Sequence, residues 1–244
     1  MGASFNRHIG TWSGTRHMKL FKRISDWERD LRASYNTDLS TPENRRRANI
    51  YNLWFDHAVL RTLWTNFWEI APGVYRSNQP THKRFAAMKA NGIKSVLNLR
   101  GSFGAAHYLV EEESCRNLGL NLTSINLQAR HAPPGEEILA MVRAFREIEK
   151  PFVMHCKSGA DRAGFAAALY LLVIEGRPMP EARRQLGLKY LHLRFSKTGV
   201  LDHILDVYEA RNAQDPIGFE DWVRADYEFV AMQNDYLSKH KPLF

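Results

Sequence analysis

Apolar and polar residues follow two different spacings through the central part of the chain. Short apolar runs of the kind found in buried strands occur at residues 93–100, 120–127 and 151–155. Amphipathic stretches with helical spacing lie around them, at residues 80–92, 107–119 and 136–150. Two further short strands are predicted around Pro72 and Gly73. Strands that alternate with helices in this way predict an α/β fold, with a mostly parallel central sheet flanked by helices.

The C-terminal part of the chain shows helical spacing throughout. Residues 162–176, RAGFAAALYLLVIEG, are apolar nearly all round, which predicts a helix buried at the centre of the fold. Further helices are expected at residues 179–188, 198–213 and 218–239. We therefore expect the α/β domain to cover residues 67–212, with a C-terminal helix in residues 213–244 that packs on it.

The N-terminal part is predicted to be helical and basic. An amphipathic helix with a basic polar face is indicated by apolar residues at helical spacing, namely Leu20, Ile24, Trp27, Leu31 and Tyr35. A second helix follows from STPENRRR onwards, with Ser40 or Thr41 as its cap and Pro42 in its first turn. We expect a flexible leader over residues 1–17 and a basic helical extension over residues 18–66. The extension either packs on the domain or lies on a membrane surface.

Composition and charge limit the classes of partner that the protein is expected to bind. The net charge is +8, and residues 1–50 hold ten Lys and Arg against five Asp and Glu, so the excess is concentrated in the extension. This charge favours an anionic partner such as a phosphorylated substrate or a membrane surface, and no nucleic-acid recognition motif is present. Two cysteines form no disulfide framework or zinc-site spacing, and no run of about 18 apolar residues occurs. We expect a cytoplasmic protein without metal or cofactor, with peripheral contact at the inner membrane surface through residues 18–50.

The stretch FVMHCKSGADRAGF, residues 152–165, carries the candidate chemistry. Cys156 directly follows a predicted strand, and a short loop leads from it into the predicted buried helix. Ligands of open α/β sheets bind at the carboxyl ends of strands, and successive N–H groups of such a loop can converge on an anion. Gly159 would allow the loop to curl, and Gly164 would let the helix approach the sheet closely.

The residue types in this loop suit an attack on phosphorus. A positive environment at a helix start favours the thiolate form of a cysteine, which is the nucleophile. The planar guanidinium of Arg162 can hold two phosphate oxygens in a bidentate fork. Together these groups predict an in-line displacement that forms a cysteinyl phosphate, which water then hydrolyses. The simpler alternative is a buried structural thiol in an ordinary strand-to-helix turn.

HCKSGADR resembles the His-Cys-(five residues)-Arg signature of the cysteine-dependent tyrosine and dual-specificity phosphatase superfamily. Upstream, GVYRSNQPTHKRFAAMKANGIKSVLNLRG is similar to the opening of compact bacterial and fungal members, so the resemblance covers roughly residues 67–207. It implies a protein-tyrosine-phosphatase-like fold with Cys156 as nucleophile and Arg162 as phosphate clamp. It also implies that His155 orients the loop and keeps the cysteine ionised. The phosphate-binding residues would be Lys157, Ser158, Gly159, Ala160, Asp161 and Arg162.

Two departures from the family pattern concern the later steps. Ala163 stands where members have a Ser or Thr that assists breakdown of the phosphoenzyme, so turnover is slow or another group helps. No Asp lies between Arg100 and His155, where members place their general acid. Asp161 is the first candidate for that role, with a loop-structuring acceptor as its alternative. The other candidate acids are His131, Glu136 and Glu137.

The sequence thus predicts a phosphomonoester hydrolase. Lys157 is similar to a lysine of lipid phosphatases in this superfamily, so an anionic phospholipid or phosphoinositide-like headgroup is one substrate class. Phosphotyrosine or phosphoserine protein is the other. Ala163 and the missing Asp support a different reading, a catalytically weak phosphate-recognition module.

Overall fold

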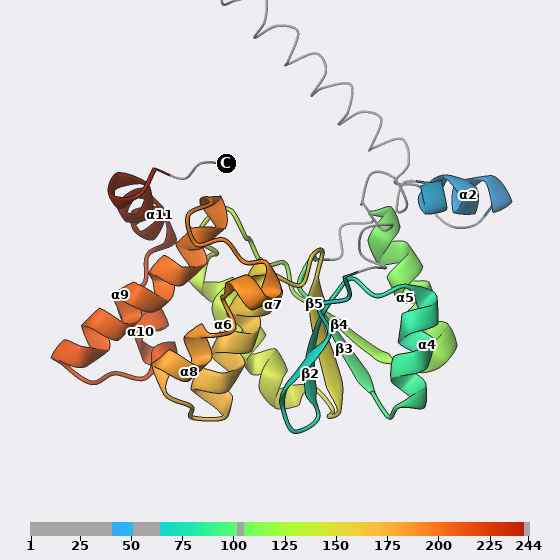
Figure 1. Ribbon diagram of the computed structural model, residues 1–244, viewed down its shortest axis with the longest axis horizontal. Helices are drawn as coiled ribbons and strands as arrows, with labels where there is room; N and C mark the ends of the chain where they lie inside the picture. Colours follow the sequence, from blue (N-terminus) through green and yellow to red (C-terminus); the bar gives the residue numbers. More distant parts are fainter. Residues whose placement is uncertain (1–40, 51–63, 102–104, 242–244) are drawn as a thin grey trace, which may run out of the picture.

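The computed structural model describes residues 41–50, 64–101 and 105–241, and its centre is a five-stranded sheet (Figure 1). The strand order is β1-β2-β5-β3-β4, with β1 antiparallel to β2 and the other neighbours parallel. The predicted mostly parallel α/β fold is confirmed. The strands are β1 (Trp68–Ala71), β2 (Val74–Asn78), β3 (Ser95–Asn98), β4 (Asn121–Ser124) and β5 (Phe152–Cys156).

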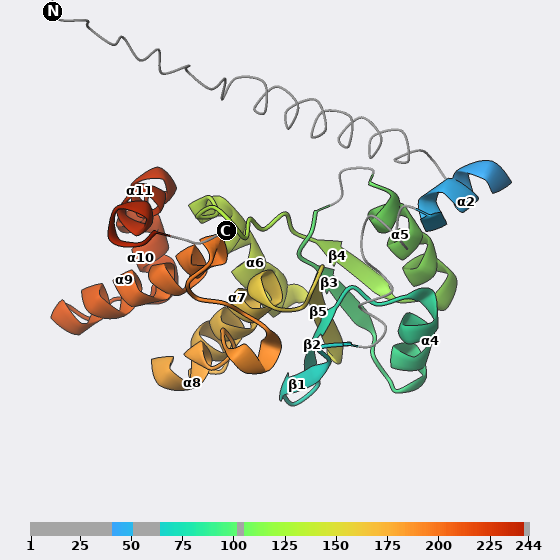
Figure 2. The same cartoon turned by 45° about the horizontal axis from the view of Figure 1, so that its top comes forward.

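Helices cover both faces of this sheet (Figures 1 and 2). On one face lie α4 (His82–Ala90) and α5 (Ala106–Leu118), and on the other lie α6 (Gly135–Glu147) and α7 (Asp161–Leu169). Three more α-helices pack outside α6 and α7: α8 (Met179–Arg183), α9 (Val200–Gln214) and α10 (Phe219–Ala225). The last helix is α11 (Phe229–Lys239), and short 3-10 helices occur at Leu188–Tyr190 and Lys197–Gly199.

The central strand β5 serves a core on each face, because successive side chains of a strand point to opposite sides. Phe152, Met154 and Cys156 belong to the large core under α6 and α7. Val153 belongs to the smaller core under α4 and α5. There the His155 and Phe85 rings pack nearly perpendicular to one another, with their centroids 6.3 Å apart. The alternation therefore directs the cysteine and the histidine before it to opposite faces.

Helix α7 is buried as predicted. Residues 163–171 are all nearly inaccessible, and most of them are alanine or other small side chains that let the helix lie close to β5. The helix ends in a wider π turn over Tyr170–Ile174.

Two helix predictions near the C-terminus were wrong. Residues 218–239 form two helices, because the Tyr227 hydroxyl donates to the Pro133 carbonyl at 2.7 Å and the Glu228 carboxylate caps the start of α11. The helix expected at 179–188 ends at Arg183. The next turn bends so that both the backbone and the side chain of Gln185 reach Arg76.

The N-terminal extension is described only at its second helix, α2 (Pro42–Ile50). Thr41, one of the two residues predicted to cap it, does so: its Oγ1 atom accepts from the N–H of Asn44 at 3.1 Å. Arg45 pairs with Glu113 of α5 at 2.8 Å, so this helix contacts the domain. The leader at 1–17, the amphipathic stretch at 20–35 and the rest of the second predicted helix lie outside the described residues. Among the helices described, none has the length and apolar character needed to cross a membrane.

Candidate active site

Cys156 lies at the carboxyl end of β5, between the ends of β2 and β3. Only 2% of the residue is exposed. Residues 157–160 then form a short loop, and α7 begins at Asp161. The predicted strand–loop–helix arrangement is therefore present, with the thiol at the base of the loop. We call residues 157–160 the phosphate loop from here on.

Gly159 is required by the close approach of β2. Its φ is +75°, and an added Cβ would lie 2.7 Å from the backbone N of Asn78 and 2.8 Å from the carbonyl of Ser77. The backbone N–H of Gln79 also donates to the Lys157 carbonyl at 3.2 Å. The predicted need for glycine at this curl is confirmed. Gly164 also permits a close approach, but to the Gln185 carbonyl after α8 and not to the sheet backbone.

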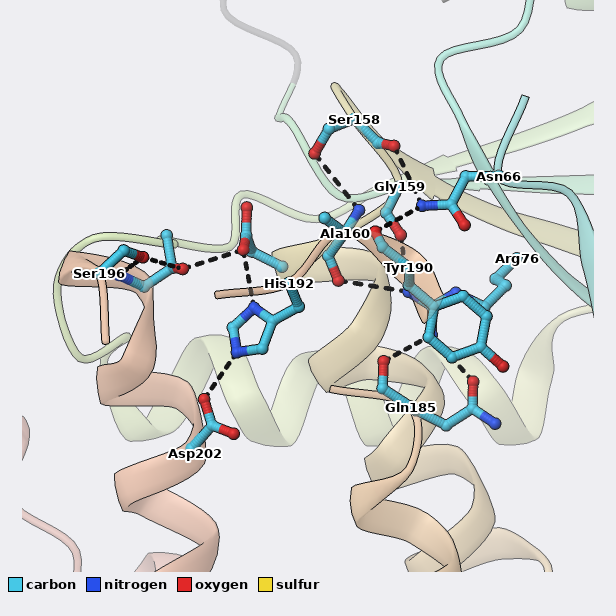
Figure 3. Close-up of polar contacts among 12 residues, drawn as sticks. Asn66, Arg76, Ser158, Gly159, Ala160, Gln185, Tyr190, His192, Ser196 and Asp202 are labelled. Carbon is cyan, nitrogen blue, oxygen red and sulfur yellow. Dashed lines mark hydrogen bonds and ion pairs between the residues drawn. The ribbon is translucent and has the colours of Figure 1, made fainter. Parts of the chain in front are cut away.

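Arg76 fixes the direction of the loop carbonyls (Figure 3). Its side chain is fully buried and donates to the carbonyls of Gly159 at 2.6 Å and Ala160 at 3.2 Å. It also donates to Gln185 and lies 3.7 Å over the Tyr190 ring. Burial lowers the Arg76 pKa to about 10, which still leaves the group charged at neutral pH. Because the N–H of a peptide unit points opposite to its C=O, these bonds turn the adjoining loop N–H groups away from Arg76.

Asn66 and Ser158 fix the start of the loop. The Asn66 side-chain amide donates to the carbonyls of Ser158 at 3.3 Å and Tyr190 at 3.0 Å (Figure 3). The Ser158 hydroxyl accepts from the N–H of Ala160 at 3.3 Å. Ser158 thus braces the loop internally, and Lys157 beside it is half-buried.

A buried polar chain holds His155, the residue before the nucleophile. The His155 Nε2 and a Glu111 carboxylate oxygen are 2.5 Å apart, and both side chains are almost wholly inaccessible. The other Glu111 oxygen accepts from the side-chain amide nitrogen of Gln79 at 2.6 Å. The side-chain oxygen of Gln79 accepts from the Arg100 guanidinium at 2.7 Å. This chain runs from α5 through the end of β2 to the end of β3. It orients the His155 ring, and the implied role of His155 in orienting the loop and keeping the cysteine ionised stays a prediction.

A second buried polar group, which includes His192 and Asp202 (Figure 3), holds Asp161, the residue at the other end of the loop. The Asp161 Oδ1 accepts from His192 Nδ1 at 2.8 Å and from the Thr198 hydroxyl at 2.9 Å. His192 Nε2 is 2.6 Å from a carboxylate oxygen of Asp202 in α9. Burial alone would lower the His192 pKa, but hydrogen bonds to two carboxylates raise it to about 9. His192 is therefore a buried cation between two acids.

This group bears on the role of Asp161. Burial acts to raise the pKa of the Asp161 carboxyl, but the hydrogen bonds from His192 and Thr198 outweigh it and hold that pKa below the ordinary value. A general acid must carry a proton at the working pH. The contacts therefore favour the structural alternative for Asp161, a loop-structuring acceptor.

The other acid candidates lie around the start of α6. His131 and Glu136 are exposed, and Glu137 is half-buried. Burial raises the pKa of the Glu137 carboxyl. Its Oε2 atom is buried and has no hydrogen-bond partner among the described residues, and a hollow of about 460 Å³ opens beside it next to His131 and Gln233. The Glu137 Oε1 is 3.5 Å from the side-chain amide of Asn126, whose backbone bridges to Arg100.

Arg162 and Ala163 begin the first turn of α7. Arg162 is half-buried, and its guanidinium lies 3.4 Å from the Leu99 carbonyl at the end of β3. A contact of this length is weak, so the guanidinium can turn towards a bound phosphate. Ala163 is fully buried. In the described part of the chain, no group of three or more His, Cys, Asp or Glu side chains is arranged to hold a metal ion.

The second cysteine lies in the other core. Cys115 packs under α4 and α5, whereas Cys156 belongs to the core under α6 and α7. Burial and the nearby Glu111 carboxylate raise the Cys115 pKa to about 12. The raised pKa disfavours a role for Cys115 as a thiol that reacts with Cys156.

A family model described as a polymorphic toxin system DSP-PTPase phosphatase matches residues 71–176, which include β2, the phosphate loop and α7. This segment, which is less than half of the chain, is similar to DSP-PTPase domains. The resemblance read from HCKSGADR is thereby confirmed. The matched segment includes every candidate acid together with Cys156 and Arg162, but not His192, Thr198 or Asp202.

A curated relative is the dual specificity protein phosphatase TpbA of Pseudomonas aeruginosa, 26% identical over 115 residues. The match covers 46% of this chain and 48% of TpbA, so the chain spans about half the length of that relative. Solved structures with a similar backbone include a putative phosphatase from Shewanella putrefaciens. Its TM-score is 0.47 at 22% identity, and the match covers 60% of this chain and 93% of that one. Another is P. aeruginosa TpbA (TM-score 0.44, 19% identity, 71% and 91%).

The sequence reasoning missed five residues that hold the phosphate loop, namely Asn66, Arg76, Glu111, His192 and Asp202. Arg76 lies within β2, far in sequence from the loop whose carbonyls it binds. One signal was available for Glu111. It shares a helix face with Ser114 and Cys115, three and four residues on, so an acid was bound to be buried beside a core cysteine. The other four come from distant segments, and nothing in their local spacing marks them.

Proposed function

We propose that this protein hydrolyses phosphomonoesters through a cysteinyl-phosphate intermediate. One observation carries the proposal. Cys156 and Arg162 stand at the two ends of a loop whose Gly159 and Ala160 carbonyls are bound by Arg76, so the N–H groups of the same peptide units point away from Arg76. Such a loop at the start of a nine-residue helix binds an anion.

In the proposed first step, the Cys156 thiolate attacks the phosphorus of the bound ester. The S–P bond forms as the P–O bond to the leaving group breaks, and the leaving oxygen takes a proton. Arg162 and the loop N–H groups hold the three remaining phosphate oxygens, where negative charge is concentrated. In the second step, water attacks the phosphorus and releases inorganic phosphate and the thiolate.

We propose Glu137 as the proton donor for the leaving group. It is the one predicted acid whose pKa is raised, and its buried Oε2 has no partner among the described residues. The loop before α6 lies at the carboxyl end of the sheet, where Asn126 bridges Arg100 next to the Leu99 carbonyl that Arg162 contacts. Glu137→Gln is expected to lower kcat on alkyl phosphates about 100-fold but to affect aryl phosphates with good leaving groups far less. Glu136→Gln is the matched control and should leave both rates unchanged.

The substrate is proposed to be a phosphorylated protein side chain or a phosphorylated lipid headgroup. The relative TpbA is a dual specificity protein phosphatase and has been crystallised in complex with phosphotyrosine, which supports the first class. The half-buried Lys157 and the basic extension support the second, since a headgroup carries more negative charge than one phosphotyrosine. Membrane contact through residues 18–50 stays a prediction, because only residues 41–50 of that segment are described.

The test is phosphate release by the full chain and by Cys156→Ser from an aryl phosphate, a phosphotyrosine peptide and phosphorylated lipids. We expect release by the wild type and none by the variant, with the ratio of kcat/KM values identifying the substrate class. Arg162→Lys should retain charge but lose the bidentate grip, with a loss of roughly 100-fold or more. Absence of release from all three substrates, with inorganic phosphate still bound, would instead show a phosphate-recognition module.

A further inference from the structure

The segment between α8 and α9 lies directly against the phosphate loop. Three of its side chains, Tyr190, His192 and Ser196, are buried. The Tyr190 carbonyl shares the Asn66 amide with Ser158, and His192 binds Asp161. The Ser196 carbonyl accepts from the Tyr236 hydroxyl at 2.7 Å. The Tyr190 carbonyl and the His192 side chain thus link this segment to both ends of the phosphate loop (Figure 3).

Three of the outward side chains of the same segment are large and apolar. Leu188, Leu191 and Phe195, which we call the apolar rim, are 73%, 59% and 54% exposed. Because Tyr190, His192 and Ser196 fix the backbone, the rim cannot fold back into the core. Trp68, itself 39% exposed, lies next to it, with the Lys189 ammonium 4.0 Å above its ring. Neighbouring exposed apolar side chains beside a ligand site mark an interaction surface.

Leu191 gives independent support. Its φ is +61°, in the left-handed region that glycine and asparagine adopt readily and that a branched side chain disfavours. Its side chain is exposed, so packing within the chain does little to offset this strain. Leu191 ends the 3-10 helix Leu188–Tyr190 in this conformation, so its branched side chain is held outward and is available for a contact.

The charge around the rim selects the kind of partner. Residues 187–199 contain Lys189, Arg194 and Lys197 and no acidic residue. All three basic side chains are exposed, although Arg194 also pairs with Asp206 at 2.5 Å. Apolar side chains that project among Lys and Arg suit the boundary between the headgroups and acyl chains of an anionic membrane.

We propose that the apolar rim docks this protein on an anionic lipid surface and presents the phosphate loop to phosphomonoesters at that surface. Leu188, Leu191 and Phe195 enter the headgroup boundary, and the adjacent basic side chains contact anionic headgroups. Because His192 and Asn66 link the segment to both ends of the phosphate loop, docking holds the catalytic centre beside the lipid. This inference rests on the proposed function for its substrate but not for the docking itself.

The test compares the full chain with Leu188→Ser/Leu191→Asn/Phe195→Ser by co-sedimentation with vesicles of phosphatidylserine and phosphatidylcholine. Binding is measured at low salt and at about 0.5 M salt, which screens the basic extension but not apolar insertion. We expect the triple variant to lose about ten-fold or more of the binding that persists in salt. Val230→Ser/Leu237→Ser is the control, since these side chains are 50% and 48% exposed but lie outside the rim.

Activity separates this inference from the proposed function. The triple variant should release phosphate from a soluble aryl phosphate at the wild-type rate, but release from a phosphorylated lipid in vesicles should fall about ten-fold. Cys156→Ser should bind vesicles as the wild type does, even if no substrate is found. Vesicle binding that is absent, or equally strong in the triple variant, would overturn the proposal. So would a matching loss on soluble phosphopeptides, which would make the rim a peptide surface.

Discussion

The phosphate loop is held between two buried histidines that have different charge environments. His155 precedes the nucleophile and meets one carboxylate, Glu111, whose other oxygen is bound by the neutral Gln79 amide. His192 grips Asp161 at the far end and meets a second carboxylate, Asp202. The other nitrogen of His155 lies 3.5 Å from the Cys156 carbonyl, a long contact, whereas His192 has an acid on each ring nitrogen, so both of its nitrogens must donate. His155 therefore acts as an oriented ring within the sheet, and His192 as a buried cation.

This difference between the two histidines predicts how each end of the phosphate loop responds to mutation and to pH. The His155 side is built from elements of the α/β domain itself, namely α5 and the ends of β2 and β3. The His192 side ties the loop to α9 and the segment before it, which lie beyond the matched family segment. A histidine between two carboxylates and a histidine beside one carboxylate should respond differently to mutation and to pH.

The largest expected effect comes from removing each histidine. His192→Leu leaves Asp161 and Asp202 without their cation, and losing one partner of such a buried group costs about 3–5 kcal/mol. His155→Leu leaves Glu111 with Gln79 still bound and should cost about 2–3 kcal/mol. Urea unfolding of both variants measures the two free energies. An equal cost, or a larger one for His155, would contradict the assignment of the cation to His192.

The next effect is a pH dependence carried by His192. Its pKa is raised from the ordinary 6.5 to about 9, so the folded protein holds this proton more tightly than the unfolded chain. The resulting stability is fully present below about pH 6.5 and is lost as pH rises through about 9. Since each pKa unit is worth about 1.4 kcal/mol, the loss is at most roughly 3 kcal/mol. Thermal unfolding of the wild type and His192→Gln from pH 6 to about 9.5 checks this, and equal slopes would refute it.

A smaller effect is expected between the two anchors, at Gly159. Gly159→Ala meets both a positive φ and β2 backbone atoms within 3 Å, so we expect a cost of about 2–3 kcal/mol and a distorted loop. Gly92→Ala is the matched control, because its φ is +88° with nothing within 4 Å of the added Cβ. It should cost about 1 kcal/mol, from backbone strain alone. Phosphate affinity, measured by calorimetry, should fall only for Gly159→Ala.

The smallest effect is expected for Glu111→Gln. A glutamine can still join His155 to Gln79 if the His155 ring moves its proton to the other nitrogen, so we expect a loss of about 1 kcal/mol or less. Asp202→Asn cannot be accommodated in this way, because His192 then keeps only one counter-charge. It should cost more and lower the His192 pKa, which NMR titration of the ring measures. A larger loss for Glu111→Gln would show that His155 also carries charge.

The sequence by itself determined the sheet, the buried helix α7 and the loop between Cys156 and Arg162. It could do so because strand and helix spacings, glycine at a tight curl and a nucleophile paired with an arginine are local properties of neighbouring residues. The site's candidate acids were visible, but the sequence placed Asp161 before Glu137, because the burial and hydrogen bonds that set their pKa values cannot be read from it. Only the tertiary structure decided that Asp161 is bound by His192.

The tertiary structure also decided what holds the loop. Arg76 reaches residues 83 and 84 positions away, Asn66 reaches 92 and 124, and Glu111 reaches 44. Contacts at such separations depend on the order of strands in the sheet and on the path of the segment between α8 and α9. The exposed leucines beside the loop follow the same rule. In the sequence they look like ordinary apolar residues, and only the fold shows that their side chains are exposed to solvent and lie outside the core.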